Sequence, residues 1–291
     1  MAKSNAPIGI YDSGAGGLTV WQALRKVLKE DLIYYADTGH LPYGDKSRQQ
    51  IISYSDTVIN FLKKFKVKAI IAACNTSSAL AVPIFQPQSS IPIFGVIEPA
   101  VQSAISISKN NRVGLLATNA TVNSGAYDKI FAQQAPLIKL FSQGCPKLVP
   151  LIEAGQYDGP EVEAAVKEYV LPLLKNDVDT IVLGCTHYPF ILPVIRRIAG
   201  GDVAIVDPAW QTALNVKKSL ADMGILSNQT QANYSFYVSG DPWEFSVRAH
   251  QFLGEKLDNV SKHIQSEIEA ETGAEAGLKS LIPIWRGKKD E

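Results

Sequence analysis

Two cysteines stand where a protein could use a thiol for chemistry. Cys74 follows an apolar run at residues 67–73, and Cys185 follows another at residues 179–184. Runs this rich in β-branched residues predict buried parallel strands. Small and hydroxyl-bearing residues then start a helical pattern, so each thiol is expected at a strand's carboxyl end, where open α/β sheets bind ligands. A neighbouring helix N-terminus favours a thiolate, so we expect both thiols to have a pKa below the free value of about 8.5.

A single cysteine of this kind would be interpreted as packing, because free cysteine is usually buried and inert. Two cysteine turns in equivalent positions favour a chemical role instead. The third cysteine, Cys145, follows no long strand and precedes Pro146, so it is predicted to be structural. Three widely spaced cysteines do not indicate a disulfide framework, and free thiols suit a reducing compartment.

Two thiols on opposite sides of a bound molecule could invert a carbon centre. Such a reaction needs two acid–base groups, one arriving deprotonated and the other protonated, and cysteine can fill both roles. The Cα proton of an amino acid is very weakly acidic, so the site must also hold the substrate carboxylate with preorganised donors as negative charge develops. The surrounding turns should supply these donors.

The predicted strand-to-helix turns do contain donors close to the thiols. They contribute N–H groups and side chains at Ser13, Asn75, Thr76, Thr186 and His187. Asp12 and Glu153 are the carboxylates best placed to accept a thiol proton or to hold a substrate ammonium group. An alternative interpretation makes His187 a capping or packing residue and Glu153 an ordinary surface carboxylate.

The composition is that of a globular protein with ample core and no global charge. The chain has 291 residues, of which 46% are hydrophobic, and its 28 Lys and Arg balance 28 Asp and Glu. This balance gives no support to nucleic-acid binding or to an anionic membrane surface. No apolar run approaches the roughly 18 residues that span a bilayer, and the N-terminus lacks a signal-peptide core, so we expect a cytoplasmic protein.

Strand and helix patterns alternate along the chain, which predicts an α/β fold with mainly parallel sheets. Residues 12–17, DSGAGG, form a glycine turn into a helix at 18–28, but they match neither G-x-G-x-x-G nor a P-loop, so nucleotide binding is not predicted. Ser47 is expected to cap a helix reaching about residue 65, and Asp207 or Pro208 to open one through residue 223. Residues 234–238 alternate like an edge strand. The pattern restarts near residue 99, so the later part repeats the earlier part in outline.

Seven motifs, in order over residues 7–255, together resemble those of the glutamate racemase family. They are DSGAGGLTV (12–20), PYG (42–44), CNT (74–76), GVI (95–97), AT with TV (117–118, 121–122), LVPLIE (148–153) and LGCTHYP (183–189). The resemblance implies interconversion of L- and D-glutamate without a cofactor, supplying D-glutamate for peptidoglycan synthesis. It also implies that Cys74 and Cys185 are the paired acid–base thiols, with Asp12 assisting the first, and His187 with Glu153 assisting the second.

The same resemblance implies the substrate contacts and the domain organisation. The contacts would be Asp12, Ser13, Tyr43, Gly44, Asn75, Thr76, Thr118, Thr121, Thr186 and His187. Two similar α/β domains, each a mainly parallel sheet flanked by helices, would enclose the active site in the cleft between them. Their boundaries would be 1–99 plus 208–262 for the first and 100–207 for the second, with a polar tail at 263–291. A homodimer is implied, with no metal, nucleic-acid or membrane partner.

Three alternatives remain open on the sequence alone. The substrate could be aspartate or another acid, because nothing in the residue types fixes the side-chain length accepted. Cys74, Cys185 and His187 could instead bind a metal, although the Cys-x-x-Cys pairing typical of structural zinc is absent. A non-catalytic amino-acid-binding protein is the third, and for that function two reactive thiols would be superfluous.

Overall fold

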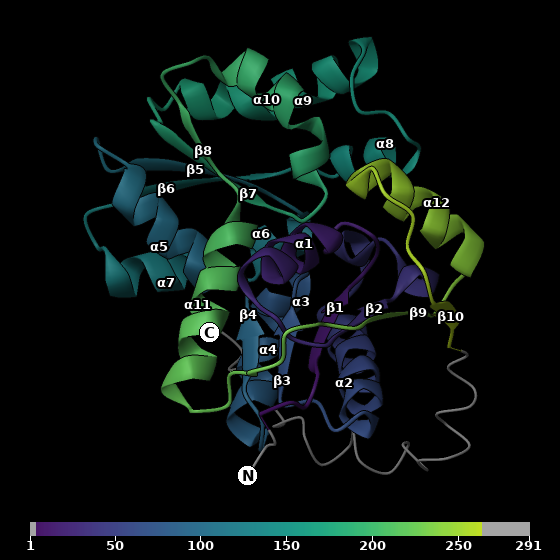
Figure 1. Cartoon of the computed structure of the whole chain (residues 1–291). Coiled ribbons are helices and arrows are strands. Elements are labelled where there is room, and N and C mark those ends of the chain that lie inside the picture. Colours follow the sequence, from purple (N-terminus) through teal and green to yellow (C-terminus); the bar gives the residue numbers. More distant parts are fainter. Residues whose placement is uncertain (1–3, 264–291) are drawn as a thin grey trace, which may run out of the picture.

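Two parallel sheets form the framework of the molecule, and Figure 1 shows them one above the other in a computed structural model that describes residues 4–263. The six-stranded sheet has the order β10-β9-β2-β1-β3-β4, and the four-stranded sheet the order β6-β5-β7-β8. Every neighbouring pair is parallel. The predicted α/β fold with two similar, mainly parallel sheets is therefore confirmed. We call the elements around the six-stranded sheet the first half and those around the four-stranded sheet the second half.

The strands of the first half come from both ends of the chain. They are β1 (Ile8–Asp12), β2 (Leu32–Ala36), β3 (Ala69–Ala72), β4 (Ile93–Gly95), β9 (Tyr234–Val238) and β10 (Val260–Lys262). The strands of the second half are consecutive: β5 (Arg112–Ala117), β6 (Lys139–Gly144), β7 (Thr180–Gly184) and β8 (Ala204–Val206). The predicted domain boundaries follow the same division of the chain, and they stay a prediction.

Helices cover both faces of each sheet. The first half has α1 (Leu18–Val27), η1 (Thr38–His40), η2 (Tyr43–Asp45), α2 (Arg48–Lys64), α3 (Asn75–Leu80), α4 (Val82–Phe85), η3 (Gln86–Gln88), α11 (Pro208–Asp222) and α12 (Pro242–Leu253). The second has α5 (Ile97–Ile107), α6 (Asn119–Asn123), α7 (Ala126–Gln134), α8 (Leu148–Glu153), α9 (Pro160–Leu174), η4 (Tyr188–Ile191) and α10 (Leu192–Ala199). α1, α11 and α12 pack on one face of the six-stranded sheet and α2 on the other.

Side-chain caps fix several helix starts. Ser47 and Gln50 form a reciprocal capping box at the start of α2, which confirms the predicted cap. Asp207 accepts a hydrogen bond from the Ala209 N–H, and Pro208 occupies the first turn of α11, as expected. Asp241 caps α12 in the same way. These local signals place the helices that follow the strand ends.

A shared apolar cluster joins the two halves. It contains Cys74 and Leu80 from the first half together with Val113 and Val182 from the second. Because this cluster is continuous, the carboxyl ends of β3 and β7 are held towards one another across the interface. Both thiols are placed by strands that are fully buried.

One strand prediction is wrong. Residues 234–238 do form a strand, β9, but it lies between β2 and β10 instead of at the sheet edge. Its alternating pattern arises because three of its five residues are only half-buried. The actual edge, Val260–Lys262, has only three residues and too short a pattern to be detected. Most of the predicted tail, residues 264–291, lies outside the described residues.

Within residues 4–263, no helix has the length and apolar character needed to cross a membrane.

Candidate active site

The two predicted reactive thiols line one cavity between the halves. Cys74 follows β3 and is the N-cap residue of α3, and Cys185 follows β7 just before η4. Only 6% of Cys74 and 7% of Cys185 is exposed. Both therefore lie at strand carboxyl ends, as the sequence predicts, although the element after Cys185 begins as a 3₁₀ turn. The cavity brings the thiols to the same space from opposite sheets.

Most of the predicted contact residues also line this cavity. Besides the thiols they are Ser13, Tyr43, Gly44, Asn75, Thr76, Thr118, Thr186 and His187. Three predicted residues, Asp12, Thr121 and Glu153, lie behind the lining and touch it through hydrogen bonds. Leu41, Pro42, Val149 and Gly184 complete the wall and were not predicted. Pro42 is next to a predicted contact, but no sequence signal distinguishes Val149 from other apolar helix residues.

Three buried threonines form a hydroxyl cluster on one side of the cavity. The Thr76 Oγ1 atom lies 3.0 Å from Thr118 Oγ1 and 3.2 Å from Thr121 Oγ1. Thr118 also caps α6 by accepting a hydrogen bond from the Thr121 N–H. The adjacent Asn75 side chain accepts a hydrogen bond from the Tyr127 hydroxyl, while its buried amide nitrogen has no hydrogen-bond partner in the structure. The cluster thus offers donors to an anionic group in the cavity.

Burial dominates the Cys74 side. Burial, followed by the negative charge of Asp12, raises the pKa of the Cys74 thiol to about 12, although the Ser77 N–H and the Ser13 hydroxyl oppose the rise. The expectation of a lowered pKa is therefore wrong for Cys74, because desolvation outweighs the start of a six-residue helix. Asp12 is itself fully buried, and burial raises its pKa against the opposing effects of His187 and the Gly14 N–H.

A hydrogen-bonded relay supports Cys185. The sulfur of Cys185 lies 3.8 Å from His187 Nδ1, and His187 Nε2 lies 2.6 Å from a Glu153 carboxylate oxygen. Burial opposes protonation of His187, but its contacts with Cys185 and Glu153 prevail and raise its pKa well above the usual value. Burial would raise the pKa of Glu153, yet the bond to His187 and the nearby Arg248 keep that pKa low. The relay therefore holds a protonated imidazole against the sulfur.

Two glycines lie in close contact with the opposite half. A Cβ atom at Gly16 would lie 2.7 Å from Thr186 Oγ1 and 2.8 Å from His187 Nδ1 across the interface. A Cβ atom at Gly44 would lie 2.9 Å from the Thr118 Cβ atom. A larger residue at either position would force Thr186 and His187, or Thr118, to shift. The Thr186 hydroxyl also crosses the interface and donates to Asp12, at 3.2 Å.

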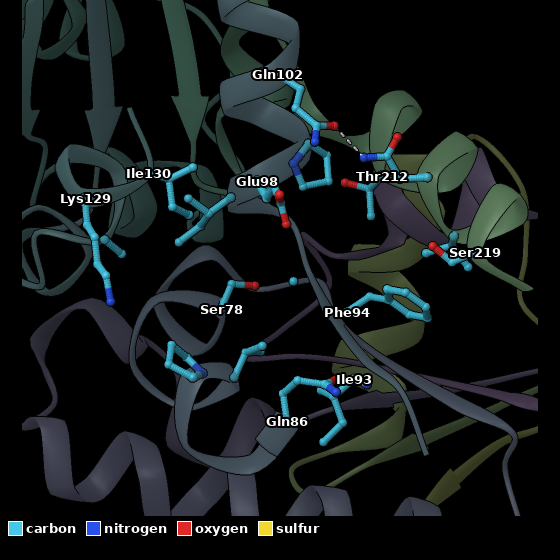
Figure 2. Close-up of a pocket in the computed structure, with 18 of the residues that line it drawn as sticks. Ser78, Gln86, Ile93, Phe94, Glu98, Gln102, Lys129, Ile130, Thr212 and Ser219 are labelled. Atoms are coloured by element: carbon cyan, nitrogen blue, oxygen red, sulfur yellow. Dashed lines mark hydrogen bonds between the residues drawn. The ribbon is translucent and has the colours of Figure 1, made fainter. Parts of the chain in front are cut away.

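A second cavity, shown in Figure 2, is larger but has a different chemistry. It has a volume of about 730 Å³ and lies among α4, β4, α5, α7 and α11. Asn215 of α11 donates to Gln102 of α5 across it, at 2.8 Å (Figure 2). Glu98, Lys129 and Lys218 are the charged residues in its wall, and no cysteine or histidine lines it. The paired thiols make the smaller cavity the candidate active site.

Comparison with known proteins identifies the family of this chain. Residues 19–215 match the family described as Asp/Glu/hydantoin racemase. The chain belongs to the Asp/Glu/hydantoin racemase family. A glutamate racemase from Desulforudis audaxviator is 40% identical over 90% of this chain and 98% of its own. One from a Thermoanaerobacter species is 41% identical over 87% of this chain and 96% of its own. The predicted resemblance to glutamate racemases is thus confirmed, and the protein is an isomerase of the racemase type.

Solved structures show the same fold. A glutamate racemase isoform from Bacillus anthracis superposes with a TM-score of 0.87 at 35% identity, covering 89% of this chain and 98% of its own. The glutamate racemase of Francisella tularensis, solved in complex with D-glutamate, gives 0.85 at 36% identity, covering 91% and 99%. The likeness spans both sheets and the interface between them.

The described residues do not contain the ligand cluster that the metal-binding alternative requires. Among the described residues, no three His, Cys, Asp or Glu side chains are grouped so as to hold a metal ion. The set of Cys74, Cys185 and His187 is therefore not arranged as a metal site. The same three residues all line the cavity between the halves.

Proposed function

We propose that this racemase interconverts L- and D-glutamate by moving the Cα proton between Cys74 and Cys185. The observation that supports this most directly is the single buried cavity whose wall contains one thiol from each half of the molecule. Relatives named glutamate racemase at about 40% identity support the choice of substrate. The Francisella tularensis structure, with D-glutamate bound, supports it further.

The substrate carboxylate should bind where donors are concentrated. The Asn75 amide nitrogen lacks a protein partner, and Thr76, Thr118 and Thr186 present hydroxyls to the same cavity. Tyr43 and Gly44 close the cavity from the loop after β2. Preorganised donors of this kind stabilise the negative charge that spreads from Cα into the carboxylate as the proton leaves. Ser13 and Asp12 lie beside Cys74, where a substrate ammonium group would be neutralised.

Each direction of the reaction uses both thiols once. In one direction the Cys185 sulfur, as thiolate, removes the Cα proton, and the neutral Cys74 thiol delivers its own proton to the opposite face. In the reverse direction the Cys74 thiolate removes the proton and the Cys185 thiol delivers one. His187 can donate to the Cys185 sulfur when it is a thiolate, and Asp12 can accept from the Cys74 thiol. No electrons are gained or lost, so the step needs acid–base groups alone.

Three further proposals come with this function. D-Glutamate made in the cytoplasm would supply peptidoglycan synthesis. Cells that lose the protein should then need added D-glutamate to grow. A homodimer is proposed, and sedimentation that gives a single monomer mass would contradict it. The domain boundaries 1–99 plus 208–262 and 100–207 are supported by the segments that build each sheet. If limited proteolysis cuts inside a proposed domain while the junctions near residues 99 and 208 stay intact, the proposed boundaries are contradicted.

The test of the function is circular dichroism of L-glutamate and D-glutamate with purified protein in deuterated water, followed by mass analysis of Cα. We expect both enantiomers to lose optical activity and to gain one deuterium at Cα. Racemisation of aspartate with glutamate untouched would keep the two-thiol mechanism and overturn the substrate. Racemisation without deuterium gain would overturn the mechanism, and inactivity towards both acids would overturn the proposal as a whole.

A further inference from the structure

Helix α12 belongs to the first half but contacts the second half beside the Cys185 relay. Figure 1 shows it next to α8, although about 90 residues separate them. Its Phe252 ring stacks on Phe190 with a centroid separation of 3.5 Å. The Gln251 side chain accepts a hydrogen bond of 3.0 Å from the Tyr157 hydroxyl. Phe252 packs against the apolar clusters of both halves, so α12 is a bridge between them.

The same helix brings a cation to the relay. Arg248 Nε lies 3.4 Å from the Glu153 oxygen that does not contact His187. The other Glu153 oxygen contacts His187 Nε2, and His187 Nδ1 faces the Cys185 sulfur. Four side chains thus form a line from α12 to the thiol. On the Cys74 side, Asp12 accepts hydrogen bonds from Gly14, Gly17 and Thr186 and feels the charge of His187, but within the described structure no lysine or arginine pairs with it.

We propose that Arg248 is a positioning residue for the Cys185 side, which holds Glu153 against His187 only while α12 is packed on the second half. This inference rests on the proposed racemisation. By occupying one carboxylate oxygen, Arg248 leaves the other directed at the imidazole. The relay is then assembled by contact between the halves, and it loosens when they separate. Proton transfer at Cys185 is therefore coupled to closure through an ion pair, whereas the hydrogen bond that Asp12 on β1 accepts from the second half comes from the neutral Thr186 hydroxyl.

The charges around Arg248 support this coupling. Glu153 and Arg248 are each about one-quarter exposed, at 23% and 25% of the side chain, so their attraction is only partly screened. A neighbouring cavity is lined by both of them together with Asp241 and Glu244 of α12. If α12 moved away from the second half, Arg248 would keep its hydrogen bond to Gln251 on the same helix but would lose Glu153. Glu153 would then lose the charge that helps keep its carboxylate ionised.

A purely structural contact between the halves would behave differently from a positioning residue. Loss of such a contact would weaken substrate binding or thermal stability without changing which proton transfer limits the rate. Loss of the positioning role slows the transfer at Cys185 selectively. Because kcat/KM in the two directions is tied by the equilibrium constant, the selectivity must be read from isotope effects. The informative quantity is the primary deuterium isotope effect on kcat/KM, measured separately for each Cα-deuterated enantiomer.

The experiment compares Arg248→Met with Arg248→Lys and with Arg197→Met as the matched control. Arg197 also pairs with carboxylates, but these are the exposed Asp158 and Glu163, and none of the three lines the cavity. We expect Arg248→Met to lower kcat/KM about threefold to fivefold, the size expected for a partly exposed ion pair. Its isotope effect should rise for the enantiomer deprotonated by Cys185 and fall for the other. Arg197→Met should match the wild type, and Arg248→Lys should restore most of the loss.

The Glu153→Gln background completes the test. If Arg248 acts through Glu153, adding Arg248→Met to Glu153→Gln should cause no further loss. Additive losses, or isotope effects that keep the wild-type ratio in Arg248→Met, would overturn the inference while leaving the proposed function intact. Wild-type protein that fails to racemise glutamate would instead overturn the proposed function.

Discussion

The two thiols face the same cavity, but their surroundings differ in kind. Cys74 is supported by Asp12, a carboxylate that is fully buried and belongs to the same half. Cys185 is supported by His187, whose partner Glu153 is 23% exposed and contacts a cation from the other half. In the proposed mechanism the reaction is chemically equivalent at the two faces of Cα, so the difference lies in the surroundings of each thiol.

The two carboxylates show how environment sets these roles. Burial raises the pKa of Asp12, while the bond to His187 and the charge of Arg248 hold the pKa of Glu153 down despite its partial burial. The same functional group thus has its pKa raised by burial on one side and lowered by charged partners on the other. If the proposed mechanism holds, the two bases reach the same cavity from opposite sides without having equivalent partners behind them.

The largest effect on activity is expected when each of the two thiols is removed in turn. Cys74→Ala and Cys185→Ala should each lower racemisation by about 10³-fold or more, because either change removes the base for one direction and the acid for the other. Each variant should still exchange Cα hydrogen with solvent in only one enantiomer, a different one in each, as measured by deuterium uptake. Substantial racemisation by either variant would sink the two-base model.

The next test removes the partner of each thiol. Asp12→Asn and His187→Asn should each reduce kcat/KM by about 10²-fold, the usual contribution of a positioned acid–base group. Because each slows one proton transfer, the primary isotope effect should rise for opposite enantiomers in the two variants. A rise for the same enantiomer in both would show that the two partners do not divide between the thiols. Thermal melting of both variants serves as the folding control.

A smaller effect is expected when the halves are pushed apart at Gly16. Gly16→Ala places a Cβ atom under 3 Å from Thr186 and His187, so the relay moves away from Asp12. We expect a loss of about 30-fold in kcat/KM, as for misplacement of a catalytic group by a fraction of an ångström. Gly201→Ala is the matched control, since its Cβ atom meets nothing within 4 Å. Equal activity of the two variants would mean that the close approach has no role in catalysis.

The smallest of these effects concerns pH. Glu153 raises the pKa of His187, so the protonated imidazole persists to higher pH in the wild type. Glu153→Gln should remove this support, lowering kcat about tenfold at neutral pH and moving the alkaline limb of the profile to lower pH. The pH dependence of kcat in both directions measures the shift. An alkaline limb that stays in place, or moves to higher pH, would exclude Glu153 as the partner that raises the pKa of His187.

The sequence determined the features that depend on neighbours along the chain. Apolar runs of seven and six residues, each followed by a cysteine, specify a buried strand end, and the side chains of Ser47 and Asp207 satisfy free N–H groups at helix starts. Seven motifs between residues 12 and 189, taken together, were sufficient to predict the family. These predictions succeed because hydrophobic period and capping act over one or two turns of chain.

Only the tertiary structure decided the features that depend on residues distant in sequence. The position of β9 inside the sheet depends on pairing with the short β10, and the contact of Arg248 with Glu153 joins positions 95 residues apart. The raised pKa of Cys74 likewise comes from surrounding atoms that exclude water, which no local pattern reports. Desolvation and charge are set by what packs around a group. The sequence therefore specifies where the two thiols lie along the chain, and the tertiary structure gives them different surroundings.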